Sequence, residues 1–125
     1  MIVKEAEKHI YVHVRFCDGK CIYCGFFSEL YDETAAHRYS EALGREFDLM
    51  SDGVKYSPET IYCGGGTPSI LSEPALEEWL NTVLVMVDTK NLREWTIEAN
   101  PGTLSSAKLK LLKMAGVNRI SIGVQ

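Results

Sequence analysis

The stretch CDGKCIYC, residues 17–24, places three cysteines at the spacing C-x3-C-x2-C, soon after a short β-rich segment, IYVHV at 10–14. Three further β-rich segments follow, at 60–63, 95–99 and 119–124. Each of the four segments is followed by residues that a strand or a helix does not require, such as cysteines or a run of glycines. After each of the first three segments, a predicted helix comes next.

Helical periodicity fills the three intervals between these strands. Apolar residues recur at three- and four-residue steps over 34–50, again over 72–87, and again near 105–115. The resulting order is β-α-β-α-β-α-β. It predicts an α/β fold with parallel strands and right-handed crossovers.

The ends of these helices carry the expected signals. Asp32 and Ser72 are placed to cap the first and second helices. In the third helix, Lys108 is one of three lysines expected toward the C-terminal end, where the helix dipole favours cations. Gly116 is expected to close that helix.

Four parallel strands can begin either an open doubly wound sheet or a (β/α) barrel. The chain stops at SIGVQ, 121–125, directly after the fourth predicted strand, whereas a full eight-fold barrel needs roughly 250 residues. We therefore expect a fragment or N-terminal portion, whose last strand has neighbours outside this chain.

Composition limits the partners and the location. The 125 residues are 46% hydrophobic and 24% charged, which is typical of one soluble globular unit. A net charge of −4 without a basic block argues against nucleic acid as a partner. The first residues, MIVKEAEKHIYVHV, carry charges where a signal peptide would need an apolar run, and no apolar run is long enough for a transmembrane segment. These features predict a cytoplasmic protein.

In a reducing cytosol, thiols are more often metal-binding or catalytic than disulfide-bonded. Cys17, Cys21 and Cys24 cluster in the sequence, whereas Cys63 stands apart. Three thiolates would leave one iron of a [4Fe–4S] cluster free to bind another ligand. The alternatives are a zinc site completed by Cys63 or a histidine, a disulfide, and inert buried thiols.

The other unusual residues also follow predicted strands. CGGGTPS at 63–69 follows the second strand, Glu98 and NPG at 100–102 close the third, and Gln125 ends the fourth. The carboxyl ends of parallel strands are where α/β proteins bind ligands. We expect the glycine turn to expose backbone N–H groups to a charged ligand, and Glu98 to accept from an ammonium or amide group. The ordinary alternatives are that the glycine run is a flexible turn between a strand and a helix, and that Glu98 is a charge pointing outward from a strand.

Aromatic and histidine side chains near the cysteines have two readings each. Tyr11 and Tyr23 are either packing aromatics or contacts of the same site. His13 either faces the interior beneath that site or is a satisfied core histidine, and we favour the second. His9 and His37 are expected to be surface residues.

Four motifs together resemble the radical S-adenosylmethionine (SAM) proteins related to oxygen-independent coproporphyrinogen III oxidase, a group that includes the haem chaperones. They are YVHVRFCDGKCIYCGFFS at 11–28, IYCGGGTPS at 61–69, IEANPGTL at 97–104 and ISIGVQ at 120–125. The resemblance implies a partial (β/α) barrel of about six units. Residues 1–125 would be an incomplete radical SAM core with the first four strands and three helices, without the rest of the barrel and the C-terminal domain.

The resemblance also implies the cofactors. Cys17, Cys21 and Cys24 would hold a [4Fe–4S] cluster whose open iron chelates the amino and carboxylate groups of SAM. Reduction would then cleave SAM to a 5′-deoxyadenosyl radical. The implied SAM contacts are Tyr11 and Tyr23 near the cluster, Gly65, Gly66 and Thr67 at the methionine end, and Glu98 and Gln125 at the nucleoside end.

Some positions depart from the family pattern. Proline is usual where Arg15 stands, and an acidic or amide residue where Gly25 stands. A larger apolar or aromatic residue is usual at Cys63, which we interpret as a buried thiol and not as a fourth ligand. The decarboxylases resemble one another in an additional cysteine at the position of Phe26.

Phe26 therefore favours the haem-chaperone branch, whose members bind haem and transfer it to an acceptor protein. The alternative is an oxygen-independent coproporphyrinogen III oxidase, which decarboxylates two propionates of coproporphyrinogen III to vinyl groups in porphyrin biosynthesis. Whether the protein is an enzyme stays open between the two. Haem or a porphyrinogen, and an electron donor such as flavodoxin or ferredoxin, are the implied partners.

Overall fold

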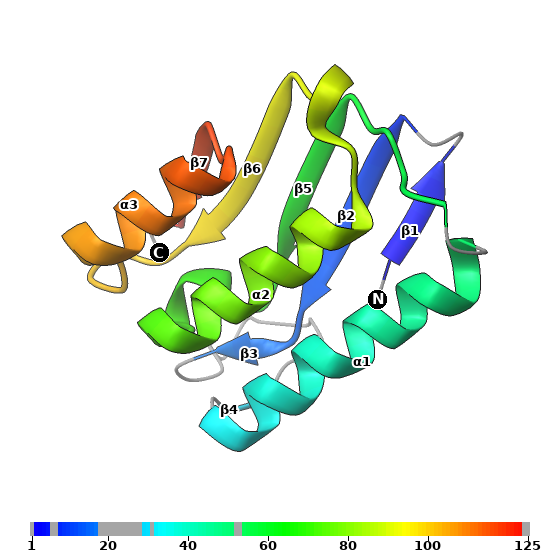
Figure 1. Cartoon of the computed structure of the whole chain (residues 1–125). Coiled ribbons are helices and arrows are strands. Elements are labelled where there is room, and N and C mark those ends of the chain that lie inside the picture. The colour runs from blue at the N-terminus through cyan, green and yellow to red at the C-terminus, as the bar shows by residue number, and fades with distance from the viewer. Residues whose placement is uncertain (1, 6–7, 18–28, 31, 52–53, 124–125) are drawn as a thin grey trace.

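The computed structural model of the chain describes residues 2–5, 8–17, 29–30, 32–51 and 54–123 (Figure 1). Its centre is a five-stranded sheet in the order β1-β2-β5-β6-β7. The strands are β1 Ile2–Glu5, β2 His9–Val14, β5 Thr60–Gly65, β6 Glu94–Ala99 and β7 Arg119–Ile122. Strands β2, β5, β6 and β7 are mutually parallel. The predicted α/β fold with four parallel strands is confirmed.

Strand β1 is the part of the sheet that the sequence pattern does not predict. It pairs antiparallel with β2, with Ile2 opposite Val12 and Glu5 opposite His9. The residues between Glu5 and His9 include no Gly, Pro, Asn or Asp, which are the usual signals of a tight hairpin. A four-residue strand is also too short for a clear alternating pattern.

Other short elements escape periodicity for the same reason. They are β3 (Phe16–Cys17) and β4 (Glu29–Leu30), which form a separate two-stranded parallel ladder, and the 3₁₀ helices η1 (Pro68–Ile70) and η2 (Thr89–Asn91). The first of these matters for the site, because β3 continues the chain from β2 to the first cysteine.

Three helices connect the parallel strands, as predicted. They are α1 Glu33–Ser51, α2 Glu73–Met86 and α3 Ser106–Ala115. Side chains cap all three N-termini: Asp32 accepts from the amides of residues 34 and 35, Ser72 from residue 75, and Ser105 from residue 108. Gly116 adopts a φ of 116° and ends α3, as expected from the sequence.

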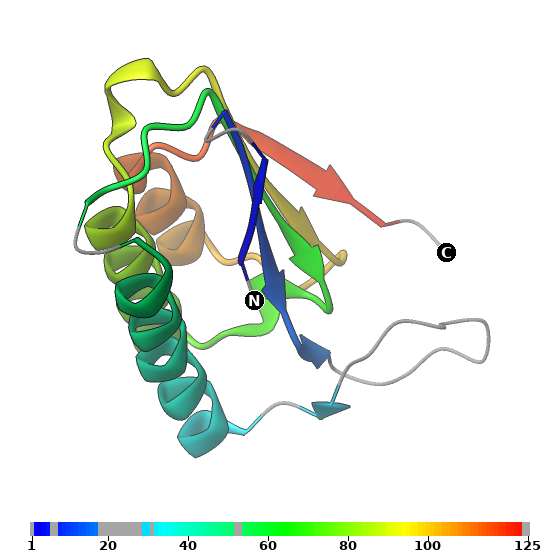
Figure 2. The ribbon, with the colours of Figure 1, turned by 90° about the vertical axis from the view of Figure 1, so that its right-hand side faces the viewer.

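All three helices cover the same face of the sheet (Figure 2). Alternate strand residues point into this layer, so that Val12 of β2, Ile61 of β5 and Ile97 of β6 join one buried core. Trp79 and Leu76 of α2 lie at its centre and are fully buried. The hydrophobic side of each strand is therefore the side toward the helices.

No described helix covers the opposite face, which we call the open face. It carries the intervening strand residues: Tyr11, His13, Tyr62, Thr96, Glu98 and Ser121. Most of them are half-buried and polar or aromatic. Parallel sheets normally have both faces covered. The polar groups of the open face are thus the first place to look for a site.

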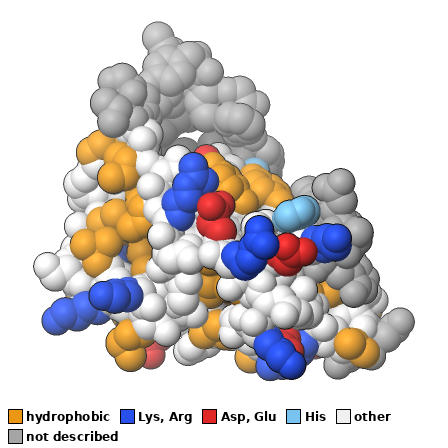
Figure 3. Space-filling view, turned by 90° about the horizontal axis from the view of Figure 1, so that it is seen from above, with side chains coloured by type: hydrophobic (Ala, Val, Ile, Leu, Met, Phe, Trp, Pro, Cys, Tyr) orange, Lys and Arg blue, Asp and Glu red, His pale blue; other side chains and the backbone are white. Residues whose placement is uncertain are grey.

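The end of the sheet where β2, β5 and β6 begin carries charges of both signs (Figure 3). Arg93 lies 3.9 Å from Glu59, and Arg119 lies 3.6 Å from Glu94. Such pairing leaves this face without a single-sign surface of the kind that binds a nucleic-acid backbone. Among the described residues, no helix is long and apolar enough to cross a membrane.

Candidate functional site

The turn after β5 is joined by backbone hydrogen bonds to the end of β2. The Gly66 amide donates to the carbonyl oxygen of Val14 at 2.5 Å, and the Thr67 amide to that of Phe16 at 2.6 Å. A Cβ atom on Gly66 would overlap both carbonyl groups, so the close approach requires glycine. Since Cys17 follows Phe16 in β3, the glycine turn lies beside the backbone that leads into the cysteine motif.

The two preceding glycines make room on the open face. A Cβ on Gly64 would overlap the carboxylate of Glu98, and one on Gly65 would overlap the ring of His13. Gly65 also has a φ of 103°, which other residues rarely adopt. At each position of the triplet, a side chain would overlap neighbouring atoms, so glycine is required. Together the glycines allow the Glu98 carboxylate and the His13 imidazole to pack against the turn.

The hydrogen bonds of this turn correct one expectation. The amides of residues 65–67 do not point at a ligand, because all three donate within the protein. Their acceptors are one carboxylate and two backbone carbonyls. The positions that side chains would take are filled by Glu98, by His13 and by the backbone carbonyls of Val14 and Phe16. What the turn can offer a ligand is therefore backbone carbonyl oxygen, which can accept from an ammonium group.

Glu98 lies at the centre of the open-face cluster. Its Oε1 accepts from the Gly65 amide at 3.0 Å, and its Oε2 accepts from the Tyr62 hydroxyl at 2.7 Å. The ring of Tyr11 stacks on that of Tyr62 with centroids 6.2 Å apart, and the Tyr11 hydroxyl lies 3.1 Å from Nδ1 of His13. His13 is hydrogen-bonded, but it is half-buried on the open face and does not lie in the core, which corrects the expectation of a core histidine. Four side chains from three strands thus meet at the carboxyl end of the sheet.

Both tyrosines keep their protons at neutral pH. Burial raises the pKa of Tyr11, and the nearby Glu98 carboxylate raises it further. Burial also raises the pKa of Tyr62, together with its hydrogen bond to Glu98. The hydroxyl of Tyr62 is therefore a donor to the Glu98 side chain.

A second polar cluster joins the turn after β5 to the turn after β6. Asn100 donates from Nδ2 to the Thr67 hydroxyl at 3.1 Å, and the Ser69 and Thr103 hydroxyls lie 2.5 Å apart. Lys108 donates to the carbonyl oxygens of Ser69 and Thr103, at 2.9 and 3.0 Å. The buried hydroxyl of Thr67 is thereby occupied by the protein itself.

Lys108 corrects the sequence prediction. It lies in the first turn of α3, where the helix dipole disfavours a cation, and not toward the C-terminal end. Partial burial lowers its pKa, and the two carbonyl oxygens that accept from its ammonium group explain its place. Neither Ser69 nor Thr103 could have been paired with it from the sequence, because their partners depend on how the two turns meet.

Cys63 lies on the helix-covered face, with its side chain opposite in direction to that of Tyr62. Its Sγ accepts from Nε1 of Trp95 at 3.4 Å, and burial raises its pKa to about 12. A protonated thiol on this face is a poor metal ligand. The interpretation of Cys63 as a buried thiol is confirmed.

The cysteine motif itself lies mostly outside the described residues. The backbone of Cys17 forms the end of β3. The predicted site residues beyond the described ranges are Cys21, Tyr23, Cys24 and Gln125, together with the neighbouring Gly25 and Phe26. Within the ranges that are described, no three His, Cys, Asp or Glu side chains form a group that could hold a metal ion.

Comparisons with known proteins agree on one family. The model of the Radical SAM superfamily matches residues 11–125. The heme chaperone HemW of Lactococcus lactis is 43% identical over 115 residues, which cover 92% of this chain and 30% of the relative. HemW of Bacillus subtilis is 39% identical, over 94% of this chain and 32% of the relative.

A solved structure, that of the coproporphyrinogen III oxidase HemN from Escherichia coli, gives a TM-score of 0.81. It is 26% identical, and the match covers 94% of this chain and 27% of that chain. The chain therefore spans 30% to 32% of the length of the two HemW relatives that it matches.

Proposed function

Because this chain belongs to the radical SAM superfamily, we propose that it is the cofactor-binding part of a haem chaperone. Cys17, Cys21 and Cys24 would hold a [4Fe–4S] cluster, leaving one iron for SAM. When bound, these cofactors supply a 5′-deoxyadenosyl radical. Residues 1–125 would form the first four parallel strands and three helices of a barrel whose remainder, with a C-terminal domain, lies outside this chain.

The single observation that carries the SAM site is the corner formed by the glycine turn and Glu98. A Cβ on any of residues 64–66 would overlap neighbouring groups, so the backbone there is stripped of side chains beside the path to Cys17. The Glu98 carboxylate supplies acceptors for the hydroxyl or amino groups of a nucleoside. This arrangement fits a ligand that has an ammonium group at one end and a nucleoside at the other.

The described residues would divide the work. Gly65 and Gly66 would form the turn that receives the methionine end of SAM, and Glu98 would orient the nucleoside. Thr67 would support that turn, because its amide donates to Phe16 and its hydroxyl accepts from Asn100. Tyr11 would lie near the cluster, with Tyr23, and Gln125 would join Glu98 at the nucleoside end.

Two observations support a chaperone. The relatives with the highest identities reported above are named heme chaperones. Phe26 also stands where the decarboxylases are expected to have a further cysteine. The partners would be haem, an acceptor protein for haem and an electron donor such as flavodoxin or ferredoxin, in the cytoplasm.

The second candidate is an oxygen-independent coproporphyrinogen III oxidase. It is favoured by the structural likeness to HemN, which is named for that activity. In that case the radical would act on propionate side chains of coproporphyrinogen III. The two candidates share the cluster and the SAM site and differ in what the remainder of the barrel presents to the tetrapyrrole.

One experiment separates them. The longest natural polypeptide that contains this chain is reconstituted anaerobically and given haem with an apo-haem protein, or coproporphyrinogen III with SAM and reductant. Haem transfer to the acceptor without formation of protoporphyrinogen is the expected result. Protoporphyrinogen with stoichiometric 5′-deoxyadenosine would assign the oxidase instead. Cys21→Ala is the control that removes the cluster from both assays.

A further inference from the structure

Tyr62 holds one oxygen of the Glu98 carboxylate, and the protein backbone holds the other. The two residues come from neighbouring strands, β5 and β6, with Tyr62 opposite Thr96 and two residues short of Glu98 in register. Oε2 accepts from the Tyr62 hydroxyl at 2.7 Å, and Oε1 from the Gly65 amide at 3.0 Å. The terminal torsion of a glutamate is soft, so two donors on opposite oxygens are what give this carboxylate one orientation.

The surroundings of Tyr62 keep its ring in place for this bond. The ring stacks against Tyr11, with 18° between the ring planes. On the near side, a Cβ at Gly64 would crowd both the Tyr62 ring and the Glu98 carboxylate. Because residue 64 is a glycine, the Tyr62 hydroxyl and the Glu98 carboxylate can approach each other above strand β5.

We propose that Tyr62 is a positioning residue, which orients the Glu98 carboxylate to receive the nucleoside of SAM. This inference rests on the proposed function, because it assigns SAM to Glu98. Each carboxylate oxygen has one donor within the described residues, and each can accept a second. The Tyr62 and Gly65 donors fix the direction in which the remaining lone pairs of Glu98 point. If either donor is lost, the carboxylate can rotate away from this orientation.

The test compares the parent protein with Tyr62→Phe, which keeps the ring and its stacking and removes only the donor. Dissociation constants for SAM are measured by anaerobic titration of the longest natural polypeptide that contains this chain, after reconstitution of the cluster. The expected loss is about 3- to 10-fold, the value of one hydrogen bond. Without SAM, the spectrum of the reduced cluster is expected to be unchanged.

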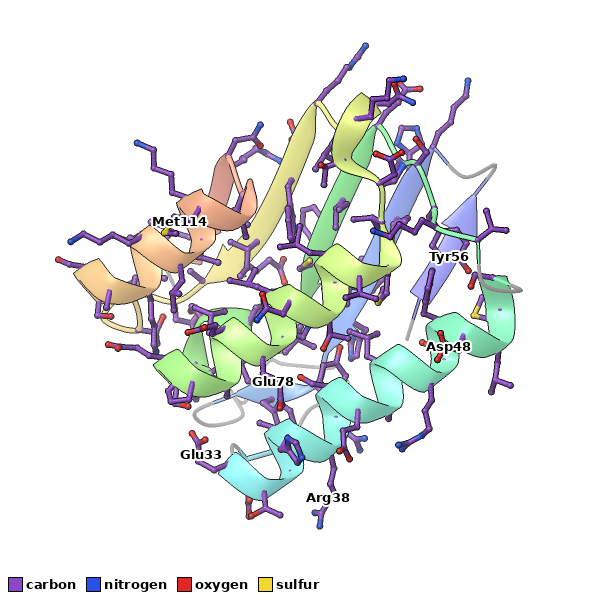
Figure 4. All side chains as sticks on the ribbon, in the orientation of Figure 1. Glu33, Arg38, Asp48, Tyr56, Glu78 and Met114 are labelled. Carbon is purple, nitrogen blue, oxygen red and sulfur yellow. The ribbon has the colours of Figure 1, made fainter. Side chains whose placement is uncertain are left out.

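Tyr56→Phe is the matched control. Tyr56 is buried against Phe47, with ring centroids 5.3 Å apart, and lies near α1 on the helix-covered side (Figure 4). Glu98 lies on the open face of the sheet. The variant removes the same hydroxyl from a tyrosine of the same fold, and we expect SAM affinity to stay at the parent value. Thermal unfolding of both variants separates a loss of affinity from a loss of fold.

A double-mutant cycle excludes a merely structural role. If Tyr62 acts through Glu98, then Tyr62→Phe adds no further loss of SAM affinity in a Glu98→Gln background. Should Tyr62→Phe unfold the protein, Gly64→Ala gives a second comparison, because its Cβ would press between the Tyr62 ring and the Glu98 carboxylate and leave both side chains whole. It is then expected to weaken SAM binding to a similar extent.

The outcomes that overturn the proposal differ from those that overturn the proposed function. A parent protein that holds a cluster and binds no SAM overturns both. A parent that binds SAM, with unchanged affinity in Tyr62→Phe, overturns the positioning role alone. Fully additive losses in the double-mutant cycle overturn it as well.

Discussion

Lys108 of α3 donates from Nζ to the backbone carbonyl of Ser69 at 2.9 Å, although 39 residues separate them along the chain. The bond ties the start of a helix to the turn after β5, which is part of the proposed SAM site. The Thr103 carbonyl accepts from the same ammonium group at 3.0 Å. The two turns at the carboxyl end of the sheet are thus held by one cation.

Replacing this lysine should cost more stability than replacing its neighbour on the same helix. Lys108→Met keeps the length of the side chain and removes the donor, so we expect a loss of about 1–2 kcal/mol in the free energy of unfolding. Lys110→Met, at an exposed position, is expected to change it by less than about 0.5 kcal/mol. Urea unfolding of both variants checks this, and equal losses would contradict the role of Lys108.

Comparing Gly65 with Gly102 separates the cost of backbone strain from the cost of steric overlap, because both have a positive φ and only one has a close neighbour. Gly65 and Gly102 have φ values of 103° and 83°. A Cβ on Gly102 would meet nothing within 4 Å, whereas one on Gly65 would overlap His13. Gly102→Ala should therefore cost about 1 kcal/mol, and Gly65→Ala roughly 1–3 kcal/mol more. Similar stabilities for the two variants in denaturant unfolding would speak against the packing of His13 on the turn.

Gly44 is a glycine that the fold does not need. It lies within α1, and a Cβ there would make an ordinary contact with Thr82 at 3.8 Å. Gly44→Ala should raise the free energy of unfolding by about 0.5–1 kcal/mol, because alanine loses less backbone entropy in a helix. A destabilised variant in thermal or urea unfolding would mean that α1 and α2 approach more closely than described.

His37 links α1 to α2 in a way that depends on pH. Its Nδ1 lies 2.7 Å from Oε2 of Glu78, and its Nε2 lies 3.2 Å from Oε1 of Glu41. The hydrogen bond with Glu78, and then the charges of both glutamates, raise the pKa of His37. Its contribution to stability is therefore fully present below the ordinary histidine pKa of about 6.5, and it is lost as pH rises through the higher pKa of the folded state.

The measurement is the difference in unfolding free energy between the parent and His37→Gln, across the pH range. We expect the parent's advantage to be larger at pH about 5.5 than at pH about 8.5. Glu78→Gln is the matched background, because it removes the partner that contributes most to the raised pKa of His37, and the pH dependence of the His37 contribution should shrink there. An advantage for His37 that does not change with pH would show that the glutamates do not hold its proton.

Cys63 should be chemically silent in the folded protein. Burial raises its pKa to about 12, and the thiolate is the reactive form. Under native conditions, iodoacetamide followed by peptide mapping should leave Cys63 unmodified, and denaturant should expose it to complete alkylation. Modification of Cys63 at a rate similar to that of a free thiol, before unfolding, would place it on an accessible surface and reopen the question of its role.

The parts of the fold that could be predicted from the sequence are those with local signals. The helix caps at Asp32 and Ser72 are short-range hydrogen bonds, and the structure has both of them. The parallel order of four strands follows from alternating strand and helix patterns. Strand β1 lacked such a signal, since nothing in its turn or its length marked a hairpin.

The candidate site also has a part that the sequence predicts and a part that depends on long-range contacts. Topology alone placed the glycine turn and Glu98 at one end of the sheet, because carboxyl ends of parallel strands share an edge. The partners within that site depend on contacts across 33 to 39 residues, such as Gly65 with Glu98, Tyr62 with Glu98 and Lys108 with Ser69. For this reason the turn was expected to expose its amides, when in fact they are occupied.

The most direct test of the proposed cofactor site is electron paramagnetic resonance of the protein after anaerobic reconstitution with iron and sulfide. The spectrum of the reduced protein is recorded with and without SAM, and Cys21→Ala serves as the control without a complete ligand set. A reduced [4Fe–4S] signal that changes on addition of SAM, and that is absent from the control, is the predicted result. A protein that keeps zinc and forms no cluster, or a cluster signal that SAM leaves unchanged, would contradict the assignment of Cys17, Cys21 and Cys24 to an open iron–sulfur site.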